Sequence, residues 1–203
     1  MPDAGEPWPS DAELLRRHVA GDDGAFGELF RRHRDRLWAV ALRTVCDQEE
    51  AADALQDAMV SAFRRAADFR GESAVTTWLH RIVVNASLDR LRRRAARPAL
   101  SAGDEQAFEA LVAQDGDPAH ATDTRLDVDA ALRILPPQQR AALVVVDMLG
   151  FSVAEAAVIL DTSPGTVKSR CARARARLLP HVAHLRGNRS ASESVSPAQG
   201  GDK

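Results

Sequence analysis

The residues best suited to chemistry in this sequence are basic, and they gather in two runs. The first run lies between residues 90 and 97, and the second lies between residues 168 and 177. No acidic residue occurs between Asp161 and Glu193. Guanidinium and ammonium groups spaced along a helix in this way bind successive phosphates of a polyanion. The members are Arg90, Arg92, Arg93, Arg94 and Arg97 in the first run, and Lys168, Arg170, Arg173, Arg175 and Arg177 in the second. The alternative is that each run is a solvated helix face.

The second run falls within a pattern that predicts a helix-turn-helix. Ser152 and Glu155 have the spacing of a capping box, which begins a helix. After a turn, Ser163 can cap the next helix, with Pro164 at its first position. At 100° per residue, one side of this second helix is apolar and can pack on the first helix. The apolar residues are Val167, Cys171, Ala174 and Leu178.

The opposite side of the same helix is small at its centre and basic at its edges. Such a surface lets the backbone enter a major groove, whose width of ~12 Å admits a helix, while the edges reach phosphates. We expect Lys168, Ser169 and Arg173 to contact base edges, and Thr166, Arg170 and Arg175 to contact phosphates. Ala172 offers only a methyl group to the groove.

The first basic run follows a loop that contains a glycine break. The loop runs from Phe69 to Trp78, and the helix after it carries Asn85. A short amide with donors and an acceptor suits a base edge, and such a loop can hold an unstacked base. The alternative for Asn85 is a solvated or capping amide.

The elements that position these residues are helices throughout. Apolar residues recur at spacings of three and four, and alternation of useful length is missing, so the predicted fold class is all-α. Residues 98–125 lose the periodicity and are rich in acidic residues, which predicts a flexible linker between two small helical domains. The predicted divisions are a helical bundle at 10–97, the linker at 98–125, a helix-turn-helix domain at 126–186 and a disordered tail at 187–203.

Several classes of protein are disfavoured by the sequence. No apolar run reaches the ~18 residues of a membrane span and the N-terminus lacks a secretory pattern, so we expect a cytoplasmic chain without membrane insertion. Cys46 and Cys171 are isolated, and His181 and His184 lack further ligands nearby, so no metal site or cofactor is expected. Neither a phosphate-binding glycine loop nor a nucleophile elbow occurs, which argues against catalysis and a small-molecule substrate.

The motifs, taken in order, resemble those of the extracytoplasmic-function (ECF) sigma factors, a group within the sigma-70 family, over about residues 11–185. These motifs are Asp53-Ala-Leu-Gln56-Asp57, Phe69-Arg-Gly-Glu-Ser73, Thr77 to Asn85, Leu135 to Arg140, Gly150 to Glu155 and Gly165 to Arg170. The resemblance implies a specificity subunit of RNA polymerase that directs promoter-specific initiation and has no catalytic residues of its own. It further implies a separate anti-sigma factor as a partner.

The resemblance also implies a role for each motif. Asp53, Gln56 and Asp57 would bind core RNA polymerase. The residues that would capture unpaired minus-ten DNA are Arg70, Gly71, Glu72, Ser73, Thr76, Thr77 and Asn85. Those that would contact minus-thirty-five duplex are Thr166, Lys168, Ser169, Arg170, Ala172, Arg173 and Arg175. Val75 and Thr76 stand where some relatives carry aromatic residues, so we expect weaker base stacking in this loop.

Two other functions remain open at this stage. A stand-alone helix-turn-helix regulator would dimerise on a palindromic operator and bind it without polymerase. The second basic site and the lack of an evident dimerisation helix argue against it. An enzyme on a helical scaffold is the other alternative, and the scattered histidines give it little support.

Overall fold

The computed structural model of the protein describes residues 8–96 and 123–191. Within these two ranges the regular elements are all helical, which confirms the predicted all-α class. In chain order they are α1 (Asp11–Val19), α2 (Asp23–Val45), α3 (Gln48–Arg64), η1 (Ala66–Asp68), α4 (Val75–Ala96), α6 (Asp123–Arg133), α7 (Pro137–Leu143), η3 (Val144–Met148), α8 (Val153–Ile159) and α9 (Pro164–Ala191). None of the described helices is both long enough and apolar enough to cross a membrane.

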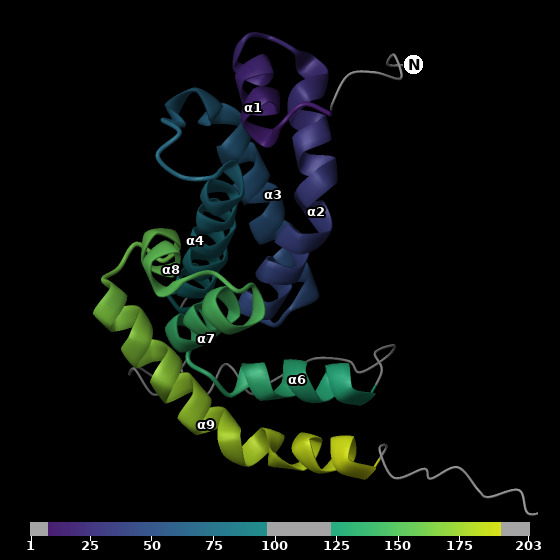
Figure 1. Cartoon of the computed structure of the whole chain (residues 1–203), viewed down its shortest axis with the longest axis vertical. Coiled ribbons are helices and arrows are strands. Elements are labelled where there is room, and N and C mark those ends of the chain that lie inside the picture. The colour runs from purple at the N-terminus through teal and green to yellow at the C-terminus, as the bar shows by residue number, and fades with distance from the viewer. Residues whose placement is uncertain (1–7, 97–122, 192–203) are drawn as a thin grey trace, which may run out of the picture.

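Helices α1 to α4 form an N-terminal bundle (Figure 1). Short polar side chains begin two of its helices, because Ser10 Oγ accepts from the Glu13 N–H at 3.2 Å and Asp47 Oδ1 accepts from the Glu50 N–H at 3.0 Å. The inner stripe of α3 consists of alanines, which lets α2 and α4 approach it closely. These alanines are Ala51, Ala54, Ala58 and Ala62, and all are buried.

The segment after α6 differs from prediction in one detail. The sequence predicts a single helix from Pro136-Pro137 to Leu149, but α7 ends at Leu143 and passes into η3, a π-helical turn. In that turn the Leu149 N–H donates to the Val144 carbonyl, five residues back, at 3.0 Å. Gly150 then ends the helix with φ +75°, a value that favours glycine. The π-helical turn coincides with consecutive β-branched valines, which have low helix propensity.

Helices α8 and α9 form the predicted helix-turn-helix. Both hydrogen bonds of the Ser152–Glu155 capping box are present at the start of α8. Asp161 takes a left-handed conformation with φ +49° in the turn, and Ser163 Oγ accepts from the Thr166 N–H at 3.2 Å at the start of α9. The predicted inner side of α9 is buried at Val167, Cys171 and Ala174, with Leu178 half-buried.

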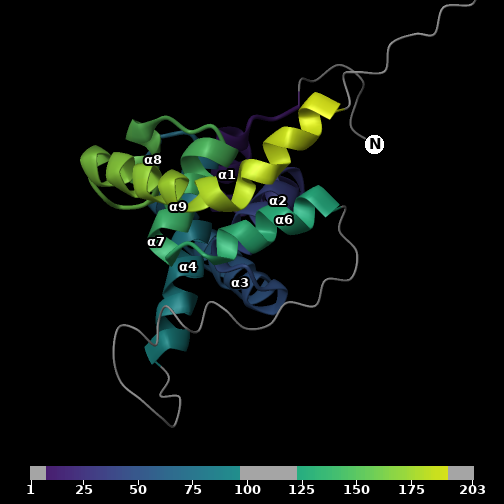
Figure 2. The same cartoon turned by 90° about the horizontal axis from the view of Figure 1, so that it is seen from below.

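The two helical parts pack directly against each other, which the sequence did not predict. Helices α7 and η3 contact α2, while α8 contacts α4. Helix α7 also contacts α4, near which it lies in Figure 2. One hydrophobic core runs through both parts, with Val40 and Val83 on the N-terminal side and Val145 and Ile159 on the C-terminal side. The N-terminal bundle and the C-terminal helices are therefore one packed body.

Two predicted boundaries fall near the limits of the described residues. Helix α6 begins at Asp123, inside the segment expected to be a linker, and residues 97–122 lie outside the described residues. Helix α9 continues to Ala191, past Gly187, where we expected the tail to begin. Residues 192–203 of the predicted tail lie outside the described residues.

Candidate functional site

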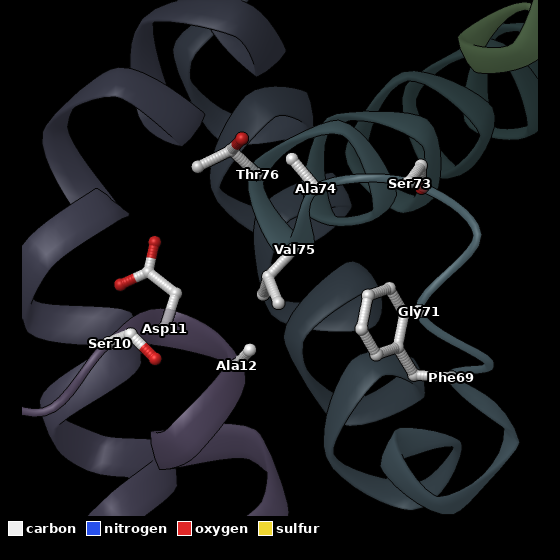
Figure 3. Close-up of a pocket in the computed structure, with 9 residues that line it drawn as sticks. All are labelled: Ser10, Asp11, Ala12, Phe69, Gly71, Ser73, Ala74, Val75 and Thr76. Atoms are coloured by element: carbon white, nitrogen blue, oxygen red, sulfur yellow. The ribbon is translucent and has the colours of Figure 1, made fainter.

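The loop between η1 and α4 forms one wall of a pocket of about 330 Å³. The opposite wall is the first turn of α1, and Val75 lies between the two walls (Figure 3). The lining residues are Ser10, Asp11, Ala12, Phe69, Gly71, Ser73, Ala74, Val75 and Thr76. This volume is at the lower end of the ~300–1,000 Å³ of small-molecule sites. The pocket therefore has room for one planar base.

Two groups at this pocket can interact with a ligand, an aromatic ring and a carboxylate. The Phe69 ring lies 5.4 Å, centroid to centroid, from that of Trp78, and the two rings are tilted by 55°. Asp11 Oδ2 lies 2.8 Å from His33 Nε2, and Asp11 Oδ1 lies 3.5 Å from Arg32 Nη1. The carboxylate is thus held by two groups of α2, while Phe69 offers a face on which a base can stack.

The structure gathers only some of the predicted minus-ten residues around the pocket. Gly71, Ser73 and Thr76 line it. Arg70 and Glu72 are exposed on the same loop but do not line the pocket, and Thr77 is buried in the bundle. Buried Thr77 presents no surface to DNA in this arrangement.

Asn85 lies on another part of α4. Nine residues separate it from Thr76, which corresponds to ~13.5 Å along the helix and two and a half turns. Asn85 therefore projects from the opposite side of α4, is half-buried, and does not line the pocket. The sequence analysis grouped Asn85 with the loop because the sequence does not show which side of a helix faces the loop that precedes it.

The predicted polymerase-binding residues lie on an exposed face of α3, and two of them are paired. Arg90, on α4, donates to Asp53 Oδ2 at 2.6 Å and to Glu50 Oε2 at 2.7 Å, with Asp57 Oδ2 at 3.5 Å. The hydrogen bond to Glu50, with the nearby charges of Asp53 and Asp57, raises the pKa of Arg90 against the effect of its burial. Gln56 is exposed beside them. The carboxylates therefore occupy fixed positions.

The outer face of α9 carries the residues expected to read duplex DNA. Lys168, Ala172 and Arg173 are exposed. The hydroxyl groups of Thr166 and Ser169 form hydrogen bonds within the same segment of the chain. Thr166 Oγ1 lies 2.9 Å from Ser163 Oγ, and Ser169 Oγ donates to the Thr166 carbonyl at 3.0 Å. Arg173 Nη2 lies 3.4 Å from Ser169 Oγ, which directs the guanidinium along the face. Lys168 and Arg173 are therefore the charged groups best placed to contact DNA.

Two residues of α9 that were predicted to contact phosphates, Arg175 and Arg170, interact with neighbouring parts of the protein. Arg175 makes a bidentate pair with Asp147 of η3 at 2.6 and 2.8 Å, which raises the pKa of Arg175. Arg170 is half-buried, and burial together with the charges of Arg173 and Arg92 lowers its pKa. In this arrangement the ion pair of Arg175 with Asp147 joins α9 to η3.

The sequence analysis missed two groups of candidate residues. Ser10, Asp11 and Ala12 were not predicted as site residues, because no local signal places α1 beside a loop almost sixty residues later. Arg90 was counted with the basic run, although it faces the carboxylates of α3. The acidic spacing of α3 was visible, but its cationic partner depends on the pairing of α3 with α4.

A helical bundle and a helix-turn-helix on one chain, each with basic residues at a predicted DNA-binding surface, define a DNA-binding protein of the transcription apparatus. Residues 29–97 match the Sigma-70 region 2 family, and residues 125–178 match the Sigma-70 region 4 family. The chain belongs to the sigma-70 family of RNA polymerase sigma factors, in the ECF group that its relatives name.

Curated relatives match most of this chain. It is 52% identical over 176 residues to the ECF RNA polymerase sigma factor SigM of Mycobacterium tuberculosis, covering 87% of this chain and 86% of that protein. It is 33% identical to the ECF RNA polymerase sigma-E factor of Escherichia coli K12, covering 82% and 91%. These matches confirm the predicted family and include both helical parts.

Solved structures also resemble this fold. The sigma factor RpoE in complex with the anti-sigma factor NepR, from Bartonella quintana, has a TM-score of 0.63 and 26% identity, covering 79% of this chain and 98% of that one. CnrH, in complex with the cytosolic domain of CnrY, has a TM-score of 0.61 and 27% identity, covering 86% and 97%.

Proposed function

We propose that this protein directs promoter-specific transcription initiation by binding core RNA polymerase and two promoter elements. The observation that carries the proposal is that one chain combines a pocket sized for a single base with a separate helix-turn-helix bearing a cationic outer face. A stand-alone repressor would need only the second feature. The proposed role requires no bond-making residue in this chain.

The C-terminal helix-turn-helix reads the minus-thirty-five element as duplex. Helix α9 enters the major groove with its small central residues against the bases. Lys168 and Arg173 donate to base edges, where guanine presents two acceptors suited to a bidentate guanidinium. Ser169 contacts base edges beside them, and Arg170 and the Thr166 hydroxyl contact the backbone.

The N-terminal bundle captures one unpaired base of the minus-ten element. The base enters between the first turn of α1 and the loop before α4, and it stacks on Phe69. Stacking on an aromatic side chain contributes about 1–3 kcal/mol per base, comparable with the few kcal/mol that unstacking a base costs. Phe69 thus supplies aromatic surface that Val75 and Thr76 lack. Asn85 contacts the promoter separately, further along α4.

Core polymerase binds the acidic face of α3. Asp53, Gln56 and Asp57 are exposed and point from one side of the helix, and Arg90 fixes the two carboxylates. A fixed acidic face recognises a basic surface on the partner and aligns it by charge complementarity. Polymerase then holds both DNA-binding parts at promoter spacing, so the weak binding of each part adds to that of the other.

A separate anti-sigma factor regulates the protein. Support comes from a similar solved structure, the sigma factor RpoE in complex with the anti-sigma factor NepR. The similar structure of CnrH is also a complex, with the cytosolic domain of CnrY. An anti-sigma factor would act on this chain by covering surfaces that polymerase requires. The promoter specificity resides in this protein whether or not an anti-sigma factor is bound to it.

Transcription by purified core polymerase on a library of promoters tests the proposal. We expect new start sites when the protein is added, with shared sequences near minus ten and minus thirty-five. The double variant Asp53→Ala, Gln56→Ala is expected to lose this activity together with polymerase association. Sequence-specific, palindromic DNA binding without polymerase would instead favour the stand-alone regulator, and unchanged start sites would reject the proposed function.

A further inference from the structure

Three arginine side chains lie near one another where α9 passes the C-terminal half of α4. Helix α8 contacts both α4 and α9, so these two helices are held close together (Figure 1). Arg170 and Arg173 belong to neighbouring turns of α9, and Arg92 belongs to α4. We call Arg92, Arg170 and Arg173 the arginine cluster. Because its members come from distant segments of the sequence, only the folded chain forms it.

Arg170 is the central member of the arginine cluster. It is half-buried, and its Nη1 is buried without a hydrogen-bond partner in the part of the chain that the structure describes. Burial and the charges of Arg173 and Arg92 lower the pKa of Arg170. Among the described side chains, the charges acting on this guanidinium are thus both positive, and an anion beside it would offset them.

The guanidinium of Arg173 is directed toward the turn of α9 that carries Arg170. Its Nη2 lies 3.4 Å from Oγ of Ser169, one turn earlier on the helix and next to Arg170 in the chain. A guanidinium has several N–H donors, and this contact uses one of them. Arg173 is exposed, so its other donors can bind a ligand from solvent.

Arg92 contributes to the arginine cluster from the other helix. Its side chain is 62% exposed, and its Nη1 pairs with Asp89 Oδ1 at 2.5 Å. This carboxylate balances one positive charge of the cluster. Three guanidinium groups against one carboxylate leave an excess of two positive charges. The cluster therefore favours a ligand that carries more than one negative charge.

Linked phosphates have the charge and the shape that the arginine cluster requires. Guanidinium groups bind phosphate oxygens through pairs of parallel hydrogen bonds. A carboxylate carries only one negative charge, and a single phosphate is too short to extend along guanidinium groups that belong to two helices. A chain of phosphates carries several charges and can contact both helices. Arg170 can turn toward it without losing a hydrogen bond to any described residue.

We propose that the arginine cluster is a binding site for linked phosphates, either inorganic polyphosphate or the phosphate chain of a nucleoside triphosphate. The ligand lies between α4 and α9 and accepts hydrogen bonds from Arg92, Arg170 and Arg173. The site does not rest on the proposed function, because it needs neither polymerase nor promoter. Its test therefore uses the full chain by itself, and failure of one proposal leaves the other standing.

Isothermal titration calorimetry of the full chain tests the ligand class. The probes are tripolyphosphate, ATP and inorganic monophosphate, all at a constant ionic strength of ~0.15 M. We expect tripolyphosphate and ATP to bind with similar affinity and monophosphate to bind at least ~10-fold more weakly, since it reaches fewer guanidinium groups. Binding of ATP without tripolyphosphate would place recognition in the nucleoside and overturn the assignment to phosphates. Lack of binding by all three probes would overturn the site.

Neutral substitutions test which residues form the site. Arg170→Gln and Arg92→Gln should each weaken tripolyphosphate binding about 10-fold, because each removes a charged hydrogen-bond donor. Arg92 is exposed, so its replacement leaves the fold intact even if that of half-buried Arg170 does not. The matched control is Lys168→Gln, which removes one charge from the same helix but from another side, about 200° from Arg170.

The control variant separates a defined site from general attraction to a basic helix. Lys168→Gln should bind tripolyphosphate with an affinity within ~2-fold of that of the unsubstituted chain, because Lys168 is not a ligand-binding residue of the proposed site. Equal weakening in Lys168→Gln and Arg92→Gln would show that only the overall charge matters. Unchanged binding in Arg92→Gln would show that α4 takes no part. Either result would overturn the proposed site.

Discussion

The guanidinium of Arg90 donates to the carboxylate of Asp53 at 2.6 Å, joining α4 to α3. Glu50 and Asp57 lie on the same guanidinium, at 2.7 and 3.5 Å. Three carboxylates on one helix face repel each other unless a cation lies among them. Arg90 therefore stabilises the acidic face that we assign to polymerase, and it does so from the helix that also carries Asn85.

Replacement of Arg90 by alanine should destabilise the bundle. Its side chain is only 22% exposed, so its ion pairs are less screened than those at an open surface. We expect the free energy of unfolding, measured in urea, to fall by about 1 kcal/mol. Arg92→Ala is the control, because Arg92 is 62% exposed and pairs with Asp89 at the surface. Equal losses in the two variants would contradict the role given to Arg90.

Replacement of Arg173 by alanine should relax selectivity at the minus-thirty-five element. Loss of a base-edge contact costs about 1–3 kcal/mol at the position read, so the preference for one base should weaken there. Initiation from promoters that differ at single minus-thirty-five positions measures the effect. Arg177→Ala, further along α9, should lower activity evenly if at all. An unchanged promoter preference in Arg173→Ala would remove Arg173 from the residues that read bases.

Filling the pocket between α1 and the loop should prevent capture of an unpaired base. Ala12 lines this pocket and is exposed, so Ala12→Trp can occupy it without disturbing the core. We expect open complexes, detected by permanganate reactivity of unpaired thymines, to fall ~10-fold or more because stacking on Phe69 is blocked. Polymerase binding should persist. Ala20→Trp places the same side chain outside the pocket, and equal loss of melting in that variant would reject the pocket.

Asn85→Ala should have a different effect from Ala12→Trp, because Asn85 lies on the opposite side of α4 from Thr76. We expect weaker initiation that depends on the base near one minus-ten position, at about 1–3 kcal/mol for a base-edge contact. Association with core polymerase should remain normal. Initiation rates on minus-ten variants measure this effect. A loss that is identical at every promoter would indicate that Asn85 contributes without reading a base.

The sequence was sufficient where helix caps and helical phase decide the structure. Ser152 with Glu155, and Ser163 with Pro164, begin α8 and α9 because caps act over three or four residues. Helical phase then identified the buried side of α9 at Val167. The outer face of α9 followed as the complement of that side, so Lys168 and Arg173 could be assigned before the structure was known.

Features that depend on distant pairing could not be predicted in this way. The contact of Arg140 with Cys46 joins residues 94 positions apart, and it depends on the packing of α7 on α2. The pocket depends on the placement of Asp11 opposite Phe69. Helical periodicity shows which side of a helix is buried but not which helix covers it, so an interface between two domains leaves no separate signal.

The stability of the N-terminal segment should depend on pH through Glu28. Hydrogen bonds from Arg31 and Arg32 lower the pKa of this carboxyl from 4.5 to about 2. Because the folded-state pKa lies below the unfolded value, the stabilisation is fully present above pH 4.5 and is lost as the pH falls toward 2. Arg32 also donates to the Pro9 carbonyl at 2.6 Å, so Glu28 helps to hold the chain that leads into the pocket wall.

The variant Glu28→Gln should therefore be less stable than the unsubstituted protein at pH 7, and the difference should shrink as the pH approaches 2. Thermal unfolding midpoints measured between pH 7 and pH 2.5 follow the effect. The control is Asp35→Asn, since the Asp35 side chain is 92% exposed and should change the midpoint little at any pH. A Glu28→Gln difference that stays constant down to pH 2.5 would show that packing, and not the charge on Glu28, holds Arg32 and the segment before α1.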